Sequence, residues 1–486
     1  MDVETIRKIR PSLRRYLDEF NGCFVKSASR RHMQTYVTGQ LSGLERKSIE
    51  PIADAAGVPP RTLQEFLSLF RWDECAVRDR LQRRVARRQG HPHSVGIIDE
   101  TSFVKKGNKT AGVQRQFCGS VGKTENCVIS VHLGYATPEF HTLLDGELYL
   151  PEETWHEDRE RCRRAGIPDD VVYRPKWRMA LEQVHRAYTN GLRFAWLTFD
   201  EGYGGKPPFL RALDEVGQNY VGEVPASFRV WTRQPEVMYR EHESHRRTGR
   251  PRKFPRLKVQ TNPTVEVRNI LTYSPVMRRE SWQEYRIKDG AKGPIVWEAK
   301  RILVWLADED GLPTRAHHLV VARNVLDPGE VKYFLSNAPE ETTVEILLLV
   351  AFSRWRVERM FQDSKGELGM DHFEVRRYIS IKRHLIVSCV SHLFLAEFWL
   401  ANREKKNRTH DRSGSDRHRS TGAHLAPAWA LHTSDRPVHQ PAVGEDPAPE
   451  RQSAPVPPQA NTATSAQNRR QTQGHPHLPM APDLAL

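Results

Sequence analysis

The spacing of apolar and polar residues divides the chain into segments with different periodicity. Residues 1–90 repeat apolar positions every three to four residues, which predicts amphipathic helices. Glycine and proline at 90–92 end this pattern, and residues 91–226 alternate apolar runs with helical stretches, which predicts the first part of an α/β core. Residues 227–324 predict a β-rich insertion, and residues 325–402 predict the second part of the core.

The first core segment has a clear order of elements. Three β-rich runs predict an antiparallel meander: "SVGIIDETSF", "NCVISVHLGYAT" and "HTLLDGELYLP". A helix, "RPKWRMALEQVHRAYTNG", leads to a second buried strand, "RFAWLTFDEGYG". The helix "PFLRALDEVG" and the short strand "NYVGEVP" follow. Meander, helix, strand, helix and strand are the order expected of a domain with one mixed sheet.

The last segment, residues 403–486, differs in composition. It holds eleven prolines and almost no periodic apolar residues, so it cannot pack a core, and we expect it to be disordered. Two interpretations remain open. The tail is a linker or interaction arm, or it is an out-of-frame translation that begins after "FLAEFWLANREKK".

Composition and charge limit the functional classes. Residues 384–401 are apolar, but His392 and Glu397 interrupt them, which favours a buried helix over a membrane span. The six cysteines form no CxxC pair, so neither a disulfide framework nor a zinc knuckle is indicated, and a reducing, cytoplasmic setting fits. A net charge of +14 predicts attraction to polyanions, of which nucleic acid is the commonest.

Two basic stretches are candidates for DNA contact. "IEPIADAAGVPPRTLQEFLSLF", near the start of the chain, fits a helix-turn-helix with Arg61 in a DNA groove, or a plain helical hairpin whose apolar residues form a core. In "HRRTGRPRKFPRLK", residues 245–258, Arg250 and Arg252 would enter a minor groove, or the stretch is a solvated basic loop. Both pairs of interpretations stay open.

"FSRWRVERMFQDSKGELGMDHFEVR", residues 352–376, places four residues on one helical face: Arg354, Glu358, Phe361 and Lys365. Ordinary ion pairs four residues apart would explain these charges on a solvated helix. The alternative is that Glu358 has carboxylate partners elsewhere in the chain.

Two such partners follow from the strands. Asp99 closes the apolar run "SVGIID", and Asp200 closes "RFAWLTFD". Two divalent cations that act on a phosphodiester need several carboxylate oxygens held on rigid elements. We therefore expect Asp99, Asp200 and Glu358 to converge within reach of common metal ions. The nearby acids Glu100 and Glu201 would point to the opposite face of their strands and are interpreted as structural.

The chain resembles the DDE transposases of bacterial insertion sequences, in the branch with a β-rich insertion between the second aspartate and the glutamate. The resemblance covers roughly residues 10–400. The family signature is Tyr, two residues, Arg, three residues, Glu, six residues and Lys; Arg354, Glu358 and Lys365 match it, and Ala351 replaces the tyrosine. The motifs that carry the resemblance are "GIIDET", "LTFDEGYG", "KYFLSNAP" and "RWRVERMFQDSKGELGMDHFEVR".

The resemblance implies an RNase H-like fold, with a helical DNA-binding domain before it and the disordered tail after it. It implies two Mg²⁺ ions, which Mn²⁺ can replace, held by Asp99, Asp200 and Glu358 as the catalytic residues. Arg354 and Lys365 would contact the DNA backbone. The expected partner is double-stranded DNA, both transposon ends and target, bound by a homodimer at the nucleoid and without a membrane.

Two rival interpretations remain. A decayed or domesticated transposase would bind DNA without catalysis; the intact acids argue against it, and the unusual tail argues for it. Another RNase H-like enzyme, a nuclease or resolvase, would not need a long β-rich insertion or a separate N-terminal DNA-binding region.

Overall fold

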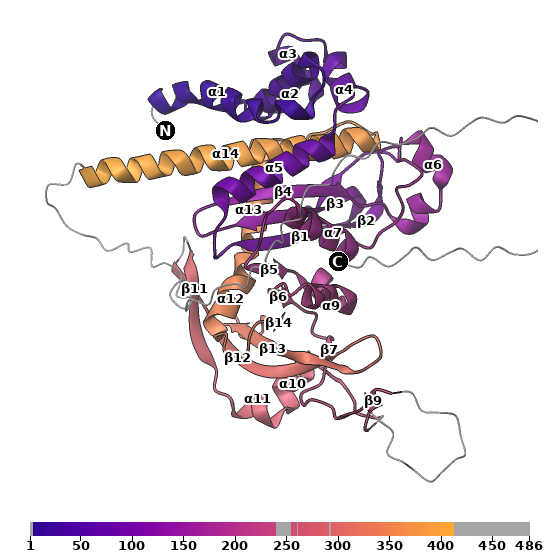
Figure 1. Cartoon of the computed structure of the whole chain (residues 1–486), viewed down its shortest axis with the longest axis vertical. Helices are drawn as coiled ribbons and strands as arrows, with labels where there is room; N and C mark the ends of the chain where they lie inside the picture. The colour runs from indigo at the N-terminus through magenta and orange to yellow at the C-terminus, as the bar shows by residue number, and fades with distance from the viewer. Residues whose placement is uncertain (1–2, 240–253, 260, 291–292, 413–486) are drawn as a thin grey trace, which may run out of the picture. The chain divides into compact units, whose positions relative to one another are not determined.

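One ten-stranded mixed sheet runs through both the expected core and the expected insertion (Figure 1). The computed structural model describes residues 3–239, 254–259, 261–290 and 293–412. The strands follow the order β11–β12–β13–β14–β6–β5–β1–β3–β2, and β4 also pairs with β3. The bounds are β1 Val95–Val104, β2 Gln114–Cys118, β3 Lys123–Ala136, β4 His141–Leu148, β5 Trp196–Phe199, β6 Tyr220–Glu223, β11 Gln283–Gly290, β12 Gly293–Ala307, β13 Pro313–Asn324 and β14 Val331–Ser336.

The centre of the sheet is parallel. Strand β5 pairs in parallel with both β1 and β6, whereas β3 pairs antiparallel with β1 and β4, as the meander predicted. Helix α9 (Pro207–Glu215) makes the crossover between β5 and β6. Apolar side chains of the central strands are buried on both faces, which is why these strands read as continuous apolar runs. They include Ile97, Ile98, Leu197, Phe199, Tyr220 and Val221.

Strands of the insertion extend this sheet rather than forming a separate one. Strand β14 pairs with β13 of the insertion on one side and with β6 of the core on the other. The insertion is therefore joined to the core by a shared strand. Its smaller elements are β7 Arg229–Val230, β8 Val237–Met238, β9 Arg256–Leu257, β10 Val265–Glu266, α10 Val267–Tyr273 and α11 Pro275–Arg279.

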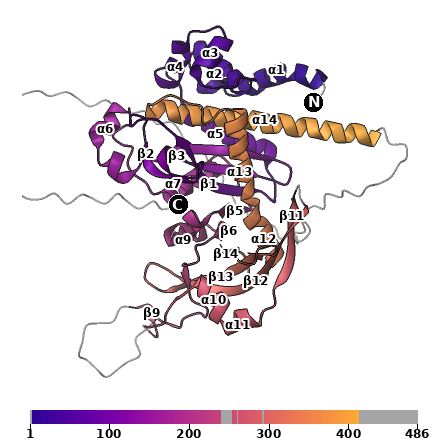
Figure 2. The ribbon, with the colours of Figure 1, turned by 180° about the vertical axis from the view of Figure 1, so that it is seen from behind.

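Residues 3–89 form helices that lie along helix α14, Tyr378–Arg412 (Figure 2). The Tyr16 hydroxyl donates to the carbonyl of Val390 at 2.8 Å, and Arg383 donates to the carbonyl of Trp72 at 2.9 Å. These helices therefore pack on helix α14. Their bounds are α1 Val3–Asp18, η1 Asn21–Cys23, α2 Ser27–Gln40, α3 Ile49–Ala55, α4 Pro60–Ser68 and α5 Glu74–Gln89.

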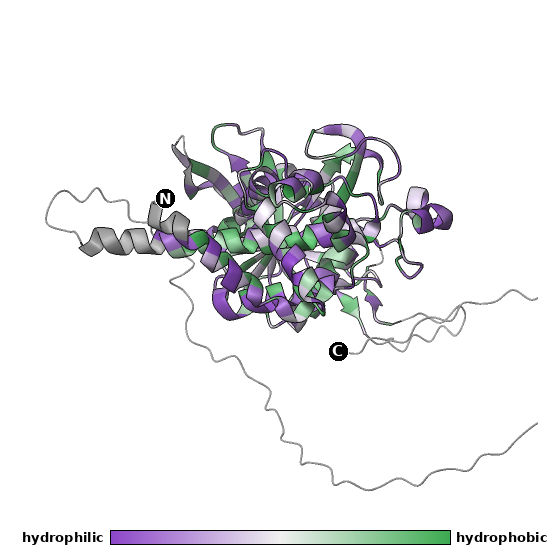
Figure 3. Cartoon of the chain, turned by 90° about the horizontal axis from the view of Figure 1, so that it is seen from above, coloured by the Kyte–Doolittle hydropathy of each residue, from purple (hydrophilic) through white to green (hydrophobic). Residues whose placement is uncertain are grey.

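Helix α14 is the longest helix of the described chain. It is long and apolar enough to cross a membrane by length and composition alone, but 61% of its apolar window is buried inside the protein, as in a core helix. Leu385, Val390 and Leu393 belong to its buried side, and its hydropathy can be followed in Figure 3. The helix continues to Arg412, ten residues past the expected tail boundary near residue 402. The tail from residue 413 lies outside the described residues.

The remaining helices lie beside the sheet and lead to the candidate site. Arg354 separates two consecutive helices, α12 (Val344–Ser353) and α13 (Trp355–Gln362). The chain then forms a π-helical turn, η3 (Asp363–Glu367), where an α-helix was expected. The other helices are η2 Glu152–His156, α6 Arg159–Arg164, α7 Lys176–Thr189 and α8 Glu201–Gly204.

Candidate active site

Asp99 and Asp200 lie side by side on neighbouring parallel strands. Ile98 of β1 is opposite Phe199 of β5, so the next residue on each strand is one of the two aspartates. Adjacent strands are about 4.8 Å apart, which brings the two carboxylates close together. Asp200 follows β5 directly, as predicted. Asp99 lies inside β1 rather than at its end, because β1 continues its pairing with β3 as far as Val104.

The glycines after Asp200 allow the turn that holds it. The Asp200 carboxylate accepts a hydrogen bond from the Gly202 amide at 3.0 Å and so caps the short helix α8. A Cβ atom on Gly204 would lie 1.9 Å from the carbonyl oxygen of Glu223, so only glycine permits α8 to approach β6 this closely. The sequence "DEGYG" therefore fixes Asp200 at the end of its strand.

Glu358 reaches the same region from helix α13. Val357 and Met360 are buried and seat the helix against the sheet, while the side chain of Glu358 is 68% exposed. Arg354 Nη1 lies 2.9 Å from Asp99 Oδ2, and its Nη2 lies 3.6 Å from Glu358 Oε1. One guanidinium thus lies between a strand carboxylate and the helix carboxylate.

A cavity of about 800 Å³ joins the predicted site residues. Lys365 lies in η3, and its Nζ donates to the carbonyl of Ser102 in β1 at 3.3 Å. The four residues predicted to share one helical face therefore line one cavity. The last of them, Lys365, lies in a π-helical turn. The predicted residues that line the cavity are Asp99, Asp200, Arg354, Glu358, Phe361 and Lys365.

The two aspartates are poorly neutralised. Burial and the neighbouring charge of Asp200 raise the pKa of Asp99 to about 7, although Arg354 acts in the opposite direction. Burial also raises the pKa of Asp200, again against the effect of Arg354. Two adjacent carboxylates in a buried site disfavour their own ionisation unless a cation compensates them. This site has more negative charge than its own cations balance.

The donor groups suit a hard divalent cation, because carboxylate oxygens are the ligands that Mg²⁺ and Mn²⁺ favour. The unbalanced charge of Asp99 and Asp200 fits such a cation. Within the described ranges, however, no three His, Cys, Asp or Glu side chains lie close enough together to hold a metal ion. The expected convergence is thus only partial: the three carboxylates line one cavity, and Arg354 stands between Asp99 and Glu358.

The residues predicted to contact DNA outside this cavity divide into two groups. The Arg61 side chain is 84% exposed on α4 and pairs with Glu65 at 2.8 Å. Leu63 and Leu67 on the same helix are fully buried, so the helical pair α3–α4 has the apolar core of a hairpin, and Arg61 is exposed on its surface. Arg250 and Arg252 lie outside the described residues.

One arginine of the arginine-rich helix α5 is neutralised inside the protein. Arg84 is 4% exposed and binds Glu397 of α14 at 2.6 Å, and it also pairs with Glu19 of the segment after α1. Arg84 is therefore not free to contact DNA.

Sequence reasoning missed an acid beside the aspartates. Phe199 of β5 is opposite Gly222 of β6, so Glu223 is next to Asp200, and its charge contributes to the raised pKa of Asp200. Lys332 binds Glu223 at 2.8 Å, which partly neutralises it. The signal was present in "NYVGEVP", a third strand that ends in an acid.

Two acids close to the predicted ligands in sequence have ion-pair partners of their own. Glu100 pairs with Lys176 at 2.7 Å, and Asp363 pairs with Arg359 at 2.9 Å. Asp363 lines a different cavity from Glu358. Glu100, interpreted as structural, instead lines the same cavity as Asp99 and Glu358, so its ion pair does not separate it from the site.

A family profile and a curated relative show what this chain is similar to. The profile described as "DDE superfamily endonuclease" matches residues 19–294, which is more than half of the chain. The probable transposase for insertion sequence element IS701 of Microchaete diplosiphon is 27% identical over 349 residues, 71% of this chain and 76% of its own length. The NurA nuclease of Sulfolobus solfataricus aligns over 67% of this chain and 88% of its own, at 10% identity and a TM-score of 0.21, which is too low to support an argument.

Proposed function

This chain belongs to the DDE superfamily endonucleases, and we propose that it is the transposase of a bacterial insertion sequence. It binds the ends of its element, cleaves DNA strands there and transfers them to a target. The observation that carries this proposal is the cavity that Asp99 and Asp200, adjacent on parallel strands, line together with Glu358.

Each acid of the cavity has a role in this proposal. Asp99, Asp200 and Glu358 would hold divalent ions, of which Mg²⁺ is the proposed physiological one and Mn²⁺ a substitute. Ions held by these three acids would supply activation of the attacking oxygen and stabilisation of the leaving oxygen of the phosphodiester. The strands fix Asp99 and Asp200, whereas Glu358 extends from an exposed helix face and has more freedom to adjust.

Arg354 and Lys365 contact the DNA backbone. Arg354 has a planar fork of donors that matches phosphate oxygens, and it already lies at the mouth of the site beside Asp99. A phosphate that engages this guanidinium would compete with Asp99 for it and free the carboxylate. Lys365 is held near β1 by its bond to Ser102 and adds a second positive charge.

The wider assignment follows the family. Double-stranded DNA is the proposed substrate, with Arg61 on the exposed face of α4 as one contact outside the cavity. We propose that two copies act together on the DNA, and that the protein works at the nucleoid in the cytoplasm. An RNase H-like core is supported by the mixed sheet with parallel β1, β5 and β6 at its centre.

Strand cleavage with Asp200→Asn tests the proposal. The amide keeps the shape of the side chain but removes the charge that holds the metal, so Mg²⁺-dependent nicking of an element-end fragment should fall at least about 100-fold. Binding to the same fragment, measured by gel shift, should stay within a few-fold of wild type. Asp363→Asn, an acid on η3 that lines another cavity, is the matched control and should nick normally.

Arg354→Ala separates the proposed phosphate contact from the proposed metal binding. Because this change removes a phosphate contact, it should weaken binding and lower the dependence of binding on salt by about one unit of slope. Normal nicking by Asp200→Asn would show that the acids are wrongly assigned. If wild type binds element ends but never nicks them, the chain is a decayed, binding-only transposase.

A further inference from the structure

Strand β2 and the turn that follows it expose apolar side chains on the wall of the acidic cavity. Phe117 is 64% exposed and Val121 is 46% exposed, and both line the same cavity as Asp99, Asp200 and Glu358. Water-exposed apolar groups beside charged catalytic candidates gain nothing in the free protein. Such a patch, rimmed by polar groups, marks a surface that another molecule covers.

Hydrogen bonds to one serine hold this turn in place. The backbone amide of Ser120 donates to the Ser102 hydroxyl at 3.1 Å, and the Cys118 thiol donates to the same oxygen at 3.3 Å. Ser102 is buried in β1, three residues beyond Asp99. Its carbonyl also accepts the bond from Lys365. Ser102 therefore joins the turn to β1, the strand of Asp99, and to Lys365, the proposed phosphate contact.

The charges around the turn identify the class of molecule that would cover it. Side chains alternate along β2, so Arg115 and Phe117 share its exposed face. Lys365 adds a second cation in the cavity that Phe117 lines. An exposed aromatic ring with an arginine on the same strand face and a lysine in the same cavity matches a nucleic-acid strand, because its phosphates pair with cations and its bases stack on rings.

We propose that Phe117 is a positioning residue whose ring stacks on a nucleobase next to the phosphate that reacts in the cavity. This inference rests on the proposed function and adds a specific contact to it. Ser102 anchors the turn, so the stacked base is held at a fixed place relative to Asp99. Because every base has an aromatic face, the contact orients the strand without reading its sequence.

Fluorescence and cleavage by three variants test the proposal. The probe is an element-end duplex with 2-aminopurine at an unpaired terminal position beside the cleavage site. Wild type should quench the fluorophore by stacking, and Phe117→Ala should lose the quenching and about tenfold in kcat/KM. Phe117→Tyr keeps the ring and should restore both. Leu326→Ala, at an apolar side chain that is 93% exposed away from the cavity residues, should behave as wild type.

Each outcome has one interpretation. Phe117→Ala that quenches and cleaves like wild type overturns the stacking contact while the proposed function stands. Unchanged quenching with altered sedimentation would assign Phe117 to contact with a second copy and also overturns it. If wild type neither binds nor cleaves element ends, the proposed function fails and this inference fails with it. Equal urea midpoints for Phe117→Ala and wild type exclude a folding defect.

Discussion

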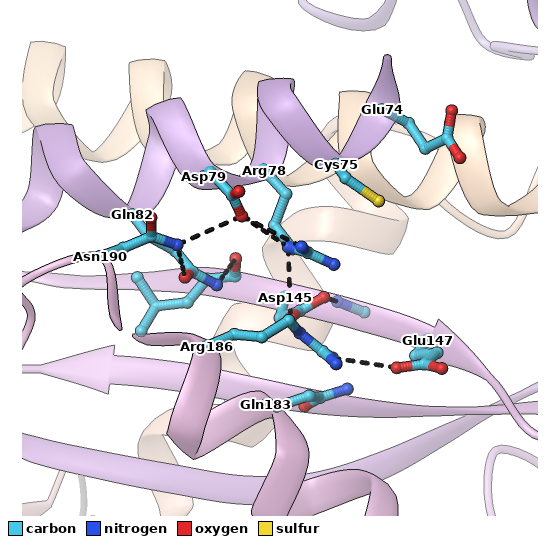
Figure 4. Close-up of polar contacts among 12 residues, drawn as sticks. Glu74, Cys75, Arg78, Asp79, Gln82, Asp145, Glu147, Gln183, Arg186 and Asn190 are labelled. Carbon is cyan, nitrogen blue, oxygen red and sulfur yellow. Dashed lines mark hydrogen bonds and ion pairs between the residues drawn. The ribbon is translucent and has the colours of Figure 1, made fainter. Parts of the chain in front are cut away.

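Two groups of buried acids on the same sheet have opposite surroundings. Asp145 and Glu147 on β4 lie among arginines and amides (Figure 4). Arg186 binds Asp145 at 3.0 Å and Glu147 at 2.9 Å, and a second arginine pairs with Glu147 from another side. Asp99 and Asp200 instead face each other, and Arg354 is the cation that binds Asp99.

The difference appears in the pKa values. Burial acts to raise the pKa of Glu147, but Arg186 and Arg174 outweigh it and lower the pKa below its usual value. At Asp99 burial and Asp200 outweigh Arg354, and the pKa rises to about 7. Acids that are neutralised by arginines of the protein stabilise the fold. Acids that it leaves unbalanced are suited to an external cation, which is why a raised pKa in a cavity favours a functional site.

Breaking the neutralised group should cause the largest loss of stability. Asp145→Ala removes one of the two carboxylates that pair with the Arg186 guanidinium and leaves Glu147 as its partner, so the free energy of unfolding should fall by about 3 kcal/mol. Urea unfolding followed by circular dichroism measures it. Asp169→Ala is the control: Asp169 is 76% exposed and its pair with Arg159 should contribute less than about 1 kcal/mol. Equal losses of unfolding free energy in Asp145→Ala and Asp169→Ala would contradict the claim that the neutralised buried acids stabilise the fold.

Removing the charge of Asp99, an acid that the protein does not neutralise, should instead increase stability. The pKa of Asp99 is raised on folding from its usual 3.8 to about 7, so ionisation of Asp99 lowers the free energy of unfolding. This loss is absent below pH 4 and grows as pH rises to 7. Without metal, Asp99→Asn should therefore match wild type near pH 4 and be more stable at pH 7.5, by at most about 4 kcal/mol. Urea unfolding in EDTA at several pH values tests this. A difference that does not change with pH would contradict it.

The smallest effect concerns Arg354. Because its charge lowers the pKa of Asp99, Arg354→Gln should raise that pKa further and cost about 1 kcal/mol of stability at pH 7.5. Carbon-13 NMR of the aspartate carboxyl groups follows the titration. Arg359→Gln, whose partner Asp363 lines another cavity, should leave Asp99 unchanged. An unaltered Asp99 titration in Arg354→Gln would show that this ion pair is absent in solution.

Patterns that act locally were predictable from the sequence. The apolar runs that become β1 and β5, and the motifs around Asp200 and Glu358, were sufficient to predict the family, which the profile match confirms. Strand β2 was missed because "QRQFC" alternates polar and apolar residues on the surface and has no long apolar run.

Pairings between distant segments were not predictable. The contact of Arg354 with Asp99 joins residues 255 positions apart. Arg84 of α5 is neutralised by Glu397, 313 positions away, a pairing that no local pattern indicates. Strand β14 carries the insertion into the core sheet by pairing with β6, which periodicity alone cannot reveal.

Metal binding by the cavity tests the central claim most directly. Electron paramagnetic resonance of free Mn²⁺ during titration measures binding without any need for catalysis. Wild type should bind Mn²⁺, Asp99→Asn and Asp200→Asn should each bind at least about tenfold more weakly, and Asp363→Asn should bind as wild type does. Mn²⁺ binding that is unchanged in both aspartate variants would contradict the assignment of this cavity as the metal-dependent catalytic centre.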